Sequence, residues 1–282
     1  MNAQIDDIIL RALAEDAPWG DVTSEAFIPE GATASAALVA REEGVLSGVE
    51  VFGRVFELVD AATTIELGLD DGEPFAAGAV LARVDGGAHA VLRAERIALN
   101  LVQHMSGIAT LTARYAAAVD GTRARIVDTR KTTPGLRILE RQAVRDGGGR
   151  NHRFSLSDAA MAKDNHLAVL QAAGVPVGEA IRRARARLGH TVHLEVEVDR
   201  LDQIEEVVAA GVDTIMLDNF TPDQLRAGID IVAGRALVEA SGGVNLDTVR
   251  AIAETGVDVI SVGALTHSVR NLDLGLDVEV AG

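Results

Sequence analysis

The sequence predicts a mixed α/β protein, with a small N-terminal α/β sandwich-like domain followed by a C-terminal parallel α/β barrel. Two observations lead to this prediction. Between residues 32 and 92 the chain has short β-like runs separated by glycines, whereas after Gly121 six short apolar runs alternate with helical patterns. Strands that alternate with helices at such intervals are typical of βαβ units and parallel sheets. At 282 residues the chain is long enough for both parts to bury a core.

The N-terminal region is predicted to combine helices and strands in one layered domain, spanning residues 1–99. Residues 4–14 place four aliphatic side chains at helical spacing, which predicts a short amphipathic helix, and residues 48–59 read as a second helix. The β-like runs lie at residues 32–40, 64–69 and 79–84. We expect no catalytic cluster within this domain.

Residues 93–118 form the longest helical pattern of the chain, and we expect Ser106-Gly107 to break it. His104 shares one face of this helix with three aliphatic residues. A histidine on such a face is more often a core or interfacial residue than a ligand, so we do not count His104 as a site residue.

The predicted barrel has polar side chains at the ends of its strands. The six apolar runs lie at residues 125–127, 159–162, 193–198, 214–217, 236–239 and 259–262. Polar groups and glycines follow or close these runs, at Asp128–Lys131, Lys163–His166, Glu197, Asp218-Asn219, Ser241-Gly242-Gly243 and Gly263. The C-terminal ends of parallel barrel strands share one rim, where active sites are built. Glycines before helices at the last two strand ends indicate a phosphate site, although Ser-Gly-Gly alone can also be a helix-capping turn.

The segment from Asp128 to His166 reverses the charge of the chain. It holds eight Lys/Arg residues against five acids, in a protein of formal net charge -16. Cationic groups gathered in a cleft attract anions, and the Arg130-Lys131 pair offers both a bidentate fork and a movable point charge. We interpret the Gly147-Gly148-Gly149 run as backbone that approaches a ligand closely. The alternative is a solvated basic face with a flexible loop.

Composition excludes several other classes of function. A sequence pI near 4.8 argues against nucleic acid and anionic membranes as partners. The absence of cysteine excludes disulfides, thiolate zinc sites and cysteine nucleophiles, and 3% aromatic residues make base-stacking platforms a poor hypothesis. No apolar run approaches the ~18 residues of a membrane span, and the acidic, amphipathic start is unlike a signal peptide. We therefore expect a cytoplasmic protein.

Several short motifs resemble one known family in their order and spacing. They are GDVTS (20–24), AERIALNL (94–101), DTRKTTPGLR (128–137), GGGRNHR (147–153) and KDNH (163–166). Together they resemble the quinolinate phosphoribosyltransferase family, also called carboxylating nicotinate-nucleotide pyrophosphorylase, and the likeness runs over nearly the whole chain. It implies an open, incomplete α/β barrel of the phosphoribosyltransferase type II kind over residues 100–265. It also implies that the tail, residues 266–282, returns to the N-terminal domain.

The resemblance implies a specific reaction. Members of this family transfer phosphoribosyl from phosphoribosyl pyrophosphate (PRPP) to quinolinate with decarboxylation, giving nicotinate mononucleotide, pyrophosphate and CO₂ in de novo NAD biosynthesis. The implied cofactor is Mg²⁺ bound with PRPP, with no organic cofactor. The implied assembly is a homodimer with an active site shared between subunits, which leaves a higher oligomer open.

The reaction assigns expected roles to residues of this chain. Lys131, Lys163 and Mg²⁺ would hold the pyrophosphate, while Glu197 and Asp218 would act on the ribose hydroxyls or hold the metal, directly or indirectly. These four are the expected catalytic residues, although Glu197 and Asp218 alone read equally well as structural groups at the barrel end. The remaining expected substrate-binding residues are Arg96 from the neighbouring subunit, Arg130, His152 and Arg153 for quinolinate, and Ser241, Gly242, Gly243, Gly263 and His267 for the 5-phosphate.

Two departures from the family pattern leave the exact pyridine carboxylate in doubt. Gln142 stands where relatives commonly have an aromatic residue, and Ala162 where a bulkier aliphatic residue is usual. The alternatives are a paralogue acting on another heteroaromatic acid, such as the ModD-like proteins associated with molybdenum transport, and an aldolase-like barrel with Lys163 as a Schiff-base lysine. A non-catalytic anion-binding protein of the same fold is the third.

Overall fold

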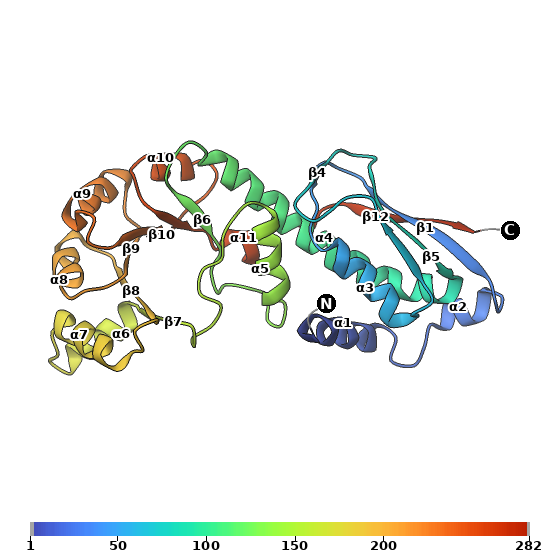
Figure 1. The fold of residues 1–282 in the computed structure, drawn as a ribbon, viewed down its shortest axis with the longest axis horizontal. Coiled ribbons are helices and arrows are strands. Elements are labelled where there is room, and N and C mark those ends of the chain that lie inside the picture. Colours follow the sequence, from blue (N-terminus) through green and yellow to red (C-terminus); the bar gives the residue numbers. More distant parts are fainter. Residues whose placement is uncertain (1–2, 281–282) are drawn as a thin grey trace. The chain divides into compact units, whose positions relative to one another are not determined.

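The computed structural model describes residues 3–280, which form two compact units. Figure 1 shows their helices and strands. The first unit contains the chain up to Ala113, residues 132–148 and the chain from Leu265 onward, and the second contains Arg114–Lys131 and Gly149–Ala264. None of the helices that the structure describes is long and apolar enough to cross a membrane.

The first unit is built on a four-stranded antiparallel sheet with the strand order β12-β1-β5-β3. Its strands are β1 (Thr33–Ala40), β3 (Thr64–Leu67), β5 (Val80–Gly87) and β12 (Leu274–Val280). The three predicted β-like runs are confirmed as β1, β3 and β5. A separate two-stranded sheet pairs β2 (Gly44–Val45) with β4 (Pro74–Phe75). Every second residue of β1 is buried, so one face of the main sheet lies on the core.

The helices of the first unit begin with α1 (Ala3–Asp16), α2 (Val22–Phe27) and α3 (Val49–Val59). The two helices predicted over residues 4–14 and 48–59 are confirmed as α1 and α3. Phe52 and Phe56 of α3 are fully buried and meet edge to face, with their ring centroids 5.0 Å apart. The GDVTS motif forms the start of α2, because the Asp21 carboxylate accepts hydrogen bonds from the amides of Thr23 and Ser24.

Helix α4 (Ala88–Ala118) runs unbroken for 31 residues, so the break expected at Ser106-Gly107 is wrong. The two residues serve packing instead. The Ser106 hydroxyl accepts from the amide of Ser47 and donates to its carbonyl, each at 3.1 Å. A Cβ on Gly107 would lie 2.3 Å from the carbonyl oxygen of Arg270. Small residues here let two other segments approach the helix closely, and a helix tolerates an isolated Gly at a cost of ~1 kcal/mol.

Helix α5 (Arg137–Asp146) groups with the first unit, whereas the sequence assigned its residues to the barrel domain. Polar contacts account for this grouping. The Glu140 carboxylate, which is fully buried, lies 2.9 Å from Nε2 of His104 on α4. The Asp146 carboxylate accepts from the Ser47 hydroxyl at 2.6 Å. These long-range partners are not apparent in the local pattern of residues 132–148.

The second unit contains a six-stranded parallel sheet with the order β6-β11-β10-β9-β8-β7. Its strands are β6 (Arg125–Val127), β7 (Ala159–Ala162), β8 (His193–Val198), β9 (Thr214–Asp218), β10 (Leu237–Ser241) and β11 (Val259–Ser261). All six predicted strands are confirmed to within two residues. In Figure 1 the sheet curves, with helices along its outer side, and β6 and β7 form its two edges. The described part of the barrel is therefore open, as the resemblance implied.

The helices around this sheet are α6 (Asp164–Ala172), α7 (Val177–Arg187), α8 (Ile204–Ala209), α9 (Pro222–Val232) and α10 (Val249–Ala253), with a short 3₁₀ turn at Leu201–Gln203. Helix α11 (Ala264–His267) follows β11 in the sequence and groups with the first unit from Leu265 onward. Side chains alternate along the strands between an apolar set and a polar set. In β10, for example, Val238 and Ala240 are buried apolar residues, whereas Glu239 and Ser241 line a cavity inside the sheet. This alternation gives the barrel a polar interior.

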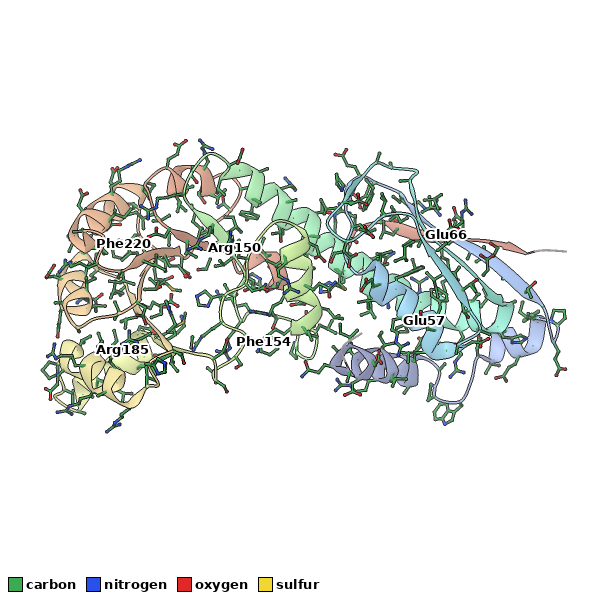
Figure 2. All side chains as sticks on the ribbon, viewed as in Figure 1. Glu57, Glu66, Arg150, Phe154, Arg185 and Phe220 are labelled. Carbon is green, nitrogen blue, oxygen red and sulfur yellow. The ribbon has the colours of Figure 1, made fainter. Side chains whose placement is uncertain are left out.

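A short extended segment lies on the free edge of β6. Arg150 forms an isolated parallel bridge with Val127, because its amide donates to the carbonyl of Ile126 at 2.9 Å and its carbonyl accepts from the amide of Asp128 at 3.2 Å. Arg150 and Phe154, labelled in Figure 2, mark the two ends of this segment. The residues between them, Asn151 to Arg153, belong to no helix or strand and reach the interior of the sheet.

Candidate active site

A cavity of about 430 Å³ lies within the second unit, at the C-terminal ends of the strands. We call it the strand-end cavity. Its lining residues are Thr129, Arg130, Lys131, His152, Arg153, Met161, Lys163, Glu197, Met216, Asp218, Glu239, Ser241 and Ser261. Eight of the thirteen predicted site residues are among them. Four of the lining side chains are Lys or Arg and three are carboxylates, Glu197, Asp218 and Glu239, so the lining has a small excess of the positive charge expected for an anion site.

The rim of the cavity carries an ion pair. The Lys163 ammonium, which follows β7, bonds the carboxylate of Glu197 on the neighbouring strand β8. The Asp218 carboxylate, at the end of β9, accepts from the side-chain amide of Asn219 at 2.6 Å. Lysine and carboxylates therefore stand on three adjacent strands, an arrangement that can hold a phosphate and a hydroxylated sugar side by side.

Asp128 organises the segment that enters the cavity from the edge of β6. Its side chain is completely buried, and its carboxylate accepts from the amide of His152 at 2.7 Å and from the side-chain amide of Asn151 at 2.6 Å. The prediction placed Asp128 at the strand end but gave it no role. The contacts assign it one, because it fixes the backbone of the Asn-His-Arg sequence that carries two predicted site residues.

The Arg153 guanidinium lies along β7. Its Nη1 donates to the carbonyl of Ala159 at 2.9 Å, and its Nη2 lies 3.6 Å from the sulfur of Met161. Burial lowers the pKa of Arg153, and the nearby Arg130 lowers it further, although a guanidinium stays charged at any physiological pH. A partly desolvated arginine fork next to a cavity suits a carboxylate ligand.

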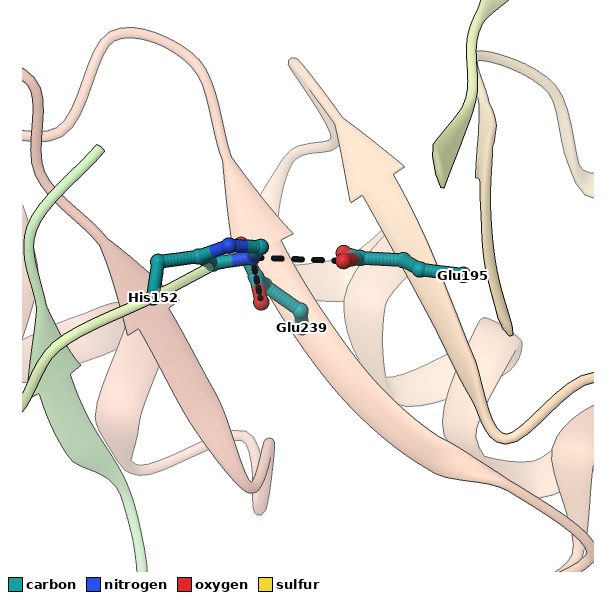
Figure 3. Close-up of side chains that lie close together, drawn as sticks. All are labelled: His152, Glu195 and Glu239. Atoms are coloured by element: carbon teal, nitrogen blue, oxygen red, sulfur yellow. Dashed lines mark ion pairs between the residues drawn. The ribbon is translucent and has the colours of Figure 1, made fainter. Parts of the chain in front are cut away.

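His152 meets two glutamates inside the sheet, as Figure 3 shows. Its Nε2 lies 3.2 Å from a carboxylate oxygen of Glu195 on β8 and 3.3 Å from one of Glu239 on β10. Burial by itself lowers the pKa of His152, but hydrogen bonds to the two glutamates outweigh it and raise the pKa to about 10. Burial raises the pKa of Glu195. The protonation of His152 and that of Glu195 therefore depend on each other.

Glu195 and Glu239 were not among the predicted site residues, although the sequence carries a signal for them. Glu195 stands inside the run HLEVEV, from which only Glu197 was given a role, and Glu239 closes the run ALVE, which was read for its apolar residues. An acid at every second position of a buried strand indicates that one face of the strand is polar. Identifying their partner was beyond the sequence, because His152 is more than forty residues from Glu195 along the chain.

Two sets of residues in the second unit have ligand types that suit a metal. Glu197 and Asp218 offer carboxylate oxygens at the rim, which suits Mg²⁺, since this ion is usually held by one or two carboxylates together with substrate phosphates. His152, Glu195 and Glu239 place one potential ligand atom each within 4.8 Å of one another. However, Nδ1 of His152 lies 2.8 Å from the amide of Arg153 and accepts from it when the ring is neutral, so the hydrogen of the neutral ring is on Nε2 and faces the carboxylates. That arrangement favours hydrogen bonding over metal ligation.

In the glycine-rich segments, Gly147 and Gly242 allow close packing against neighbouring atoms. A Cβ on Gly147 would lie 2.3 Å from the carbonyl oxygen of Ala109 on α4, so this residue of the GGG run approaches a helix and not a ligand, contrary to our interpretation. Gly242 has φ +87°, and its Cβ would lie 2.2 Å from the side-chain oxygen of Asn219. Gly242, Gly243 and Gly263 do not line the strand-end cavity.

The two remaining predicted site residues belong to the first unit. Arg96 lies on α4 with an exposed side chain, and His267 lies at the end of α11, where its ring contacts the hydroxyl of Ser268. Their roles in the site remain predictions.

Comparisons with known proteins agree over the whole chain. A family model described as quinolinate phosphoribosyl transferase, C-terminal domain, matches residues 108–277, and the model of the N-terminal domain matches residues 21–106. The nicotinate-nucleotide pyrophosphorylase (carboxylating) of Mycobacterium leprae is 45% identical over 278 residues, 96% of each chain. A probable nicotinate-nucleotide pyrophosphorylase (carboxylating) of Bacillus subtilis is 42% identical over 280 residues, covering 99% of this chain and 95% of the relative.

A solved structure agrees with the fold. NadC from Streptococcus pyogenes superposes with a TM-score of 0.94 and 42% identity, covering 100% of this chain and 99% of that one. The sequence matches and the shared architecture show that the chain belongs to the quinolinate phosphoribosyl transferase family.

Proposed function

We propose that this protein transfers phosphoribosyl from PRPP to quinolinate with decarboxylation, giving nicotinate mononucleotide, pyrophosphate and CO₂ in de novo NAD biosynthesis. The observation that carries the proposal is the strand-end cavity, which combines four Lys/Arg side chains with the carboxylates of Glu197 and Asp218 in a chain of this family. The cytoplasmic location expected from the sequence is part of the same proposal.

The leaving pyrophosphate requires positive charge. Lys131 and Lys163 line the cavity and can supply two movable cations. Bound Mg²⁺ supplies further charge that neutralises the pyrophosphate, and Glu197 and Asp218 would hold it directly or through water. The same two carboxylates face the ribose, where they favour the oxocarbenium character that develops at C1 as the bond to pyrophosphate breaks. When PRPP binds, its phosphates compete with Glu197 for the Lys163 ammonium.

Quinolinate brings two carboxylates to the cavity. Arg130 and Arg153 line it, and each can bind a carboxylate bidentately. Both ring nitrogens of His152 already face protein groups, so we assign His152 to the wall of the quinolinate site and not to a direct bond with a carboxylate. The partner subunit's Arg96 completes the site in the proposed homodimer, and its exposed position on α4 is compatible with that role.

The 5-phosphate of PRPP is assigned to the ends of β10 and β11. Ser241 lines the cavity, and Gly242, Gly243 and Gly263 follow the two strands, where free backbone amides can point at a phosphate. His267 is the proposed side-chain partner. Ribosylation makes the pyridine nitrogen cationic, so the carbanion formed when the C2 carboxylate leaves is stabilised by the adjacent positive charge. Decarboxylation then needs mainly positioning.

The test is incubation of the purified protein with quinolinate, PRPP and Mg²⁺, following nicotinate mononucleotide, pyrophosphate and CO₂ together, with nicotinate as the parallel substrate. We expect the three products in equal amounts from quinolinate and no product from nicotinate. Saturable quinolinate binding without any product would refute the proposed activity and favour the non-catalytic or paralogue hypothesis.

A further inference from the structure

Two buried glutamates in the barrel interior have no part in the chemistry proposed above. Glu195 and Glu239 have side chains that are only 4% and 3% exposed, and each points one carboxylate oxygen at Nε2 of His152. Burying two carboxylates is costly unless they are hydrogen-bonded. Their position next to a predicted site residue therefore calls for a functional explanation.

The His152 segment depends on side-chain contacts for its position. Residues 151–153 lie outside all helices and strands, and the single bridge at Arg150 is the last backbone pairing before them. Asp128 holds the backbone at Asn151 and His152. The two glutamates hold the other end of the His152 side chain, because its Nε2 lies between them.

The ring of His152 connects these glutamates to the next residue. Its Nδ1 accepts from the amide of Arg153 at 2.8 Å, so β8 and β10 are linked through the glutamates and the imidazole to the Arg153 backbone. Arg153 then places its guanidinium along β7 and into the lining of the strand-end cavity. A bidentate arginine must be held within about 0.5 Å of its productive position to be useful.

We infer that Glu195 and Glu239 are positioning residues for quinolinate: as hydrogen-bond acceptors they orient the His152 ring, and through it they set the Arg153 guanidinium that binds the substrate carboxylate. This inference rests on the proposed function. It assigns the glutamates to the pyridine dicarboxylate and leaves the PRPP contacts, which come from other strand ends, unaffected.

The function of the two glutamates as hydrogen-bond acceptors can be tested separately from the effect of their negative charge. Glutamine is neutral and keeps an oxygen that can accept from Nε2–H, whereas methionine is neutral, similar in size and a poor acceptor. The variants Glu195→Gln/Glu239→Gln and Glu195→Met/Glu239→Met remove the same charge and differ in the side-chain amide, whose oxygen can accept from Nε2–H. Glu179→Gln, an exposed change on α7, is the matched control.

The measurement is the KM for quinolinate and for PRPP, with kcat, for each variant. An arginine–carboxylate hydrogen bond lost through misplacement corresponds to about a tenfold or larger rise in KM. We expect that rise for quinolinate in the methionine pair, with the KM for PRPP unchanged within about twofold. The glutamine pair should stay close to the control. A general disturbance of the structure would change the KM for PRPP and kcat as well as the KM for quinolinate.

A second experiment keeps the inference testable if the methionine pair does not fold. His152→Ala leaves a space beside two acceptors, which added imidazole can fill while donating an N–H. We expect imidazole to lower the quinolinate KM of this variant, and thiazole, a ring of similar size that carries no N–H at neutral pH, to have no effect.

Equal quinolinate KM values for the methionine and glutamine pairs would overturn the inference, as would equal rescue by imidazole and thiazole. The unaltered protein in the same assay tests the proposed function separately. Absence of product there would refute the function, whereas normal product with indistinguishable variants would refute only the positioning role.

Discussion

Gly147→Ala tests whether the glycine run after α5 serves packing. The Cβ of alanine would lie 2.3 Å from the carbonyl oxygen of Ala109 and 2.6 Å from Cβ of Thr112, both on α4. These atoms belong to a backbone and to a branch point, so neither can rotate away. Because Gly147 has φ -78°, an ordinary value for any residue, the expected effect is purely steric.

The magnitude follows from two opposing effects. Forcing a methyl group into a packed region costs about 1–3 kcal/mol. Restricting the unfolded chain by replacing glycine offsets about 0.4–1 kcal/mol of this. We expect a net loss of about 2 kcal/mol in the free energy of unfolding, because rigid atoms favour the upper part of the steric range. For a domain of this size that corresponds to a decrease in Tm of about 4–8 °C.

The assay is thermal unfolding followed by circular dichroism, with Gly189→Ala as the control. A Cβ at Gly189 would meet only Val192, at 3.8 Å, so the control should change stability by less than about 0.5 kcal/mol. If Gly147→Ala unfolds at the same temperature as Gly189→Ala, the steric reasoning is refuted, and a ligand-facing role for the run becomes the better explanation.

Three further predictions concern the site and the first unit. Lys131→Ala should lower kcat by at least about 10²-fold, while Arg250→Ala, on the surface of α10, should leave it unchanged; equal rates would remove the basic cluster from the mechanism. Arg96→Ala and Lys163→Ala should each be nearly inactive but regain activity when co-refolded, and no recovery in verified mixed dimers would refute a shared site. A hydrogen bond to a buried glutamate raises the pKa of His104. This hydrogen bond therefore contributes fully to the free energy of unfolding at pH values below the pKa of His104 in the unfolded chain, ~6.5. The contribution is lost as the pH rises through the higher pKa of His104 in the folded protein. Urea unfolding across that range should show the loss, and His104→Gln should abolish it.

Much of the barrel was predictable from sequence because its determinants are local. Each strand is a short apolar run bounded by polar residues, and the rule that C-terminal strand ends share a rim is sufficient to bring Lys163, Glu197 and Asp218 together. The family resemblance added the openness of the barrel and the return of the tail, which six apolar runs alone do not establish.

The errors share a physical cause, which is contact between segments far apart in sequence. Ser106-Gly107 reads as a helix break until Ser47 and Arg270 are known to lie against it. The GGG run reads as a ligand loop until Gly147 meets α4. The local sequence gives Glu195 and Glu239 no role, because their partner, His152, comes from a segment at the edge of β6. In each case a small or polar residue was judged by its neighbours in the chain, whereas its partners come from elsewhere.

The pairing of β12 with β1 has a consequence for synthesis of the protein. These strands are far apart in the sequence, with Ala34 opposite Val280 and Ala40 opposite Leu274. During translation β1 can pair with β5 early, but its other side stays an open edge until β12 has been synthesised. An eight-residue strand with exposed backbone groups is a template for pairing with other chains. Nascent or C-terminally shortened forms should therefore be prone to aggregation and should depend on chaperones in a way that the finished protein does not.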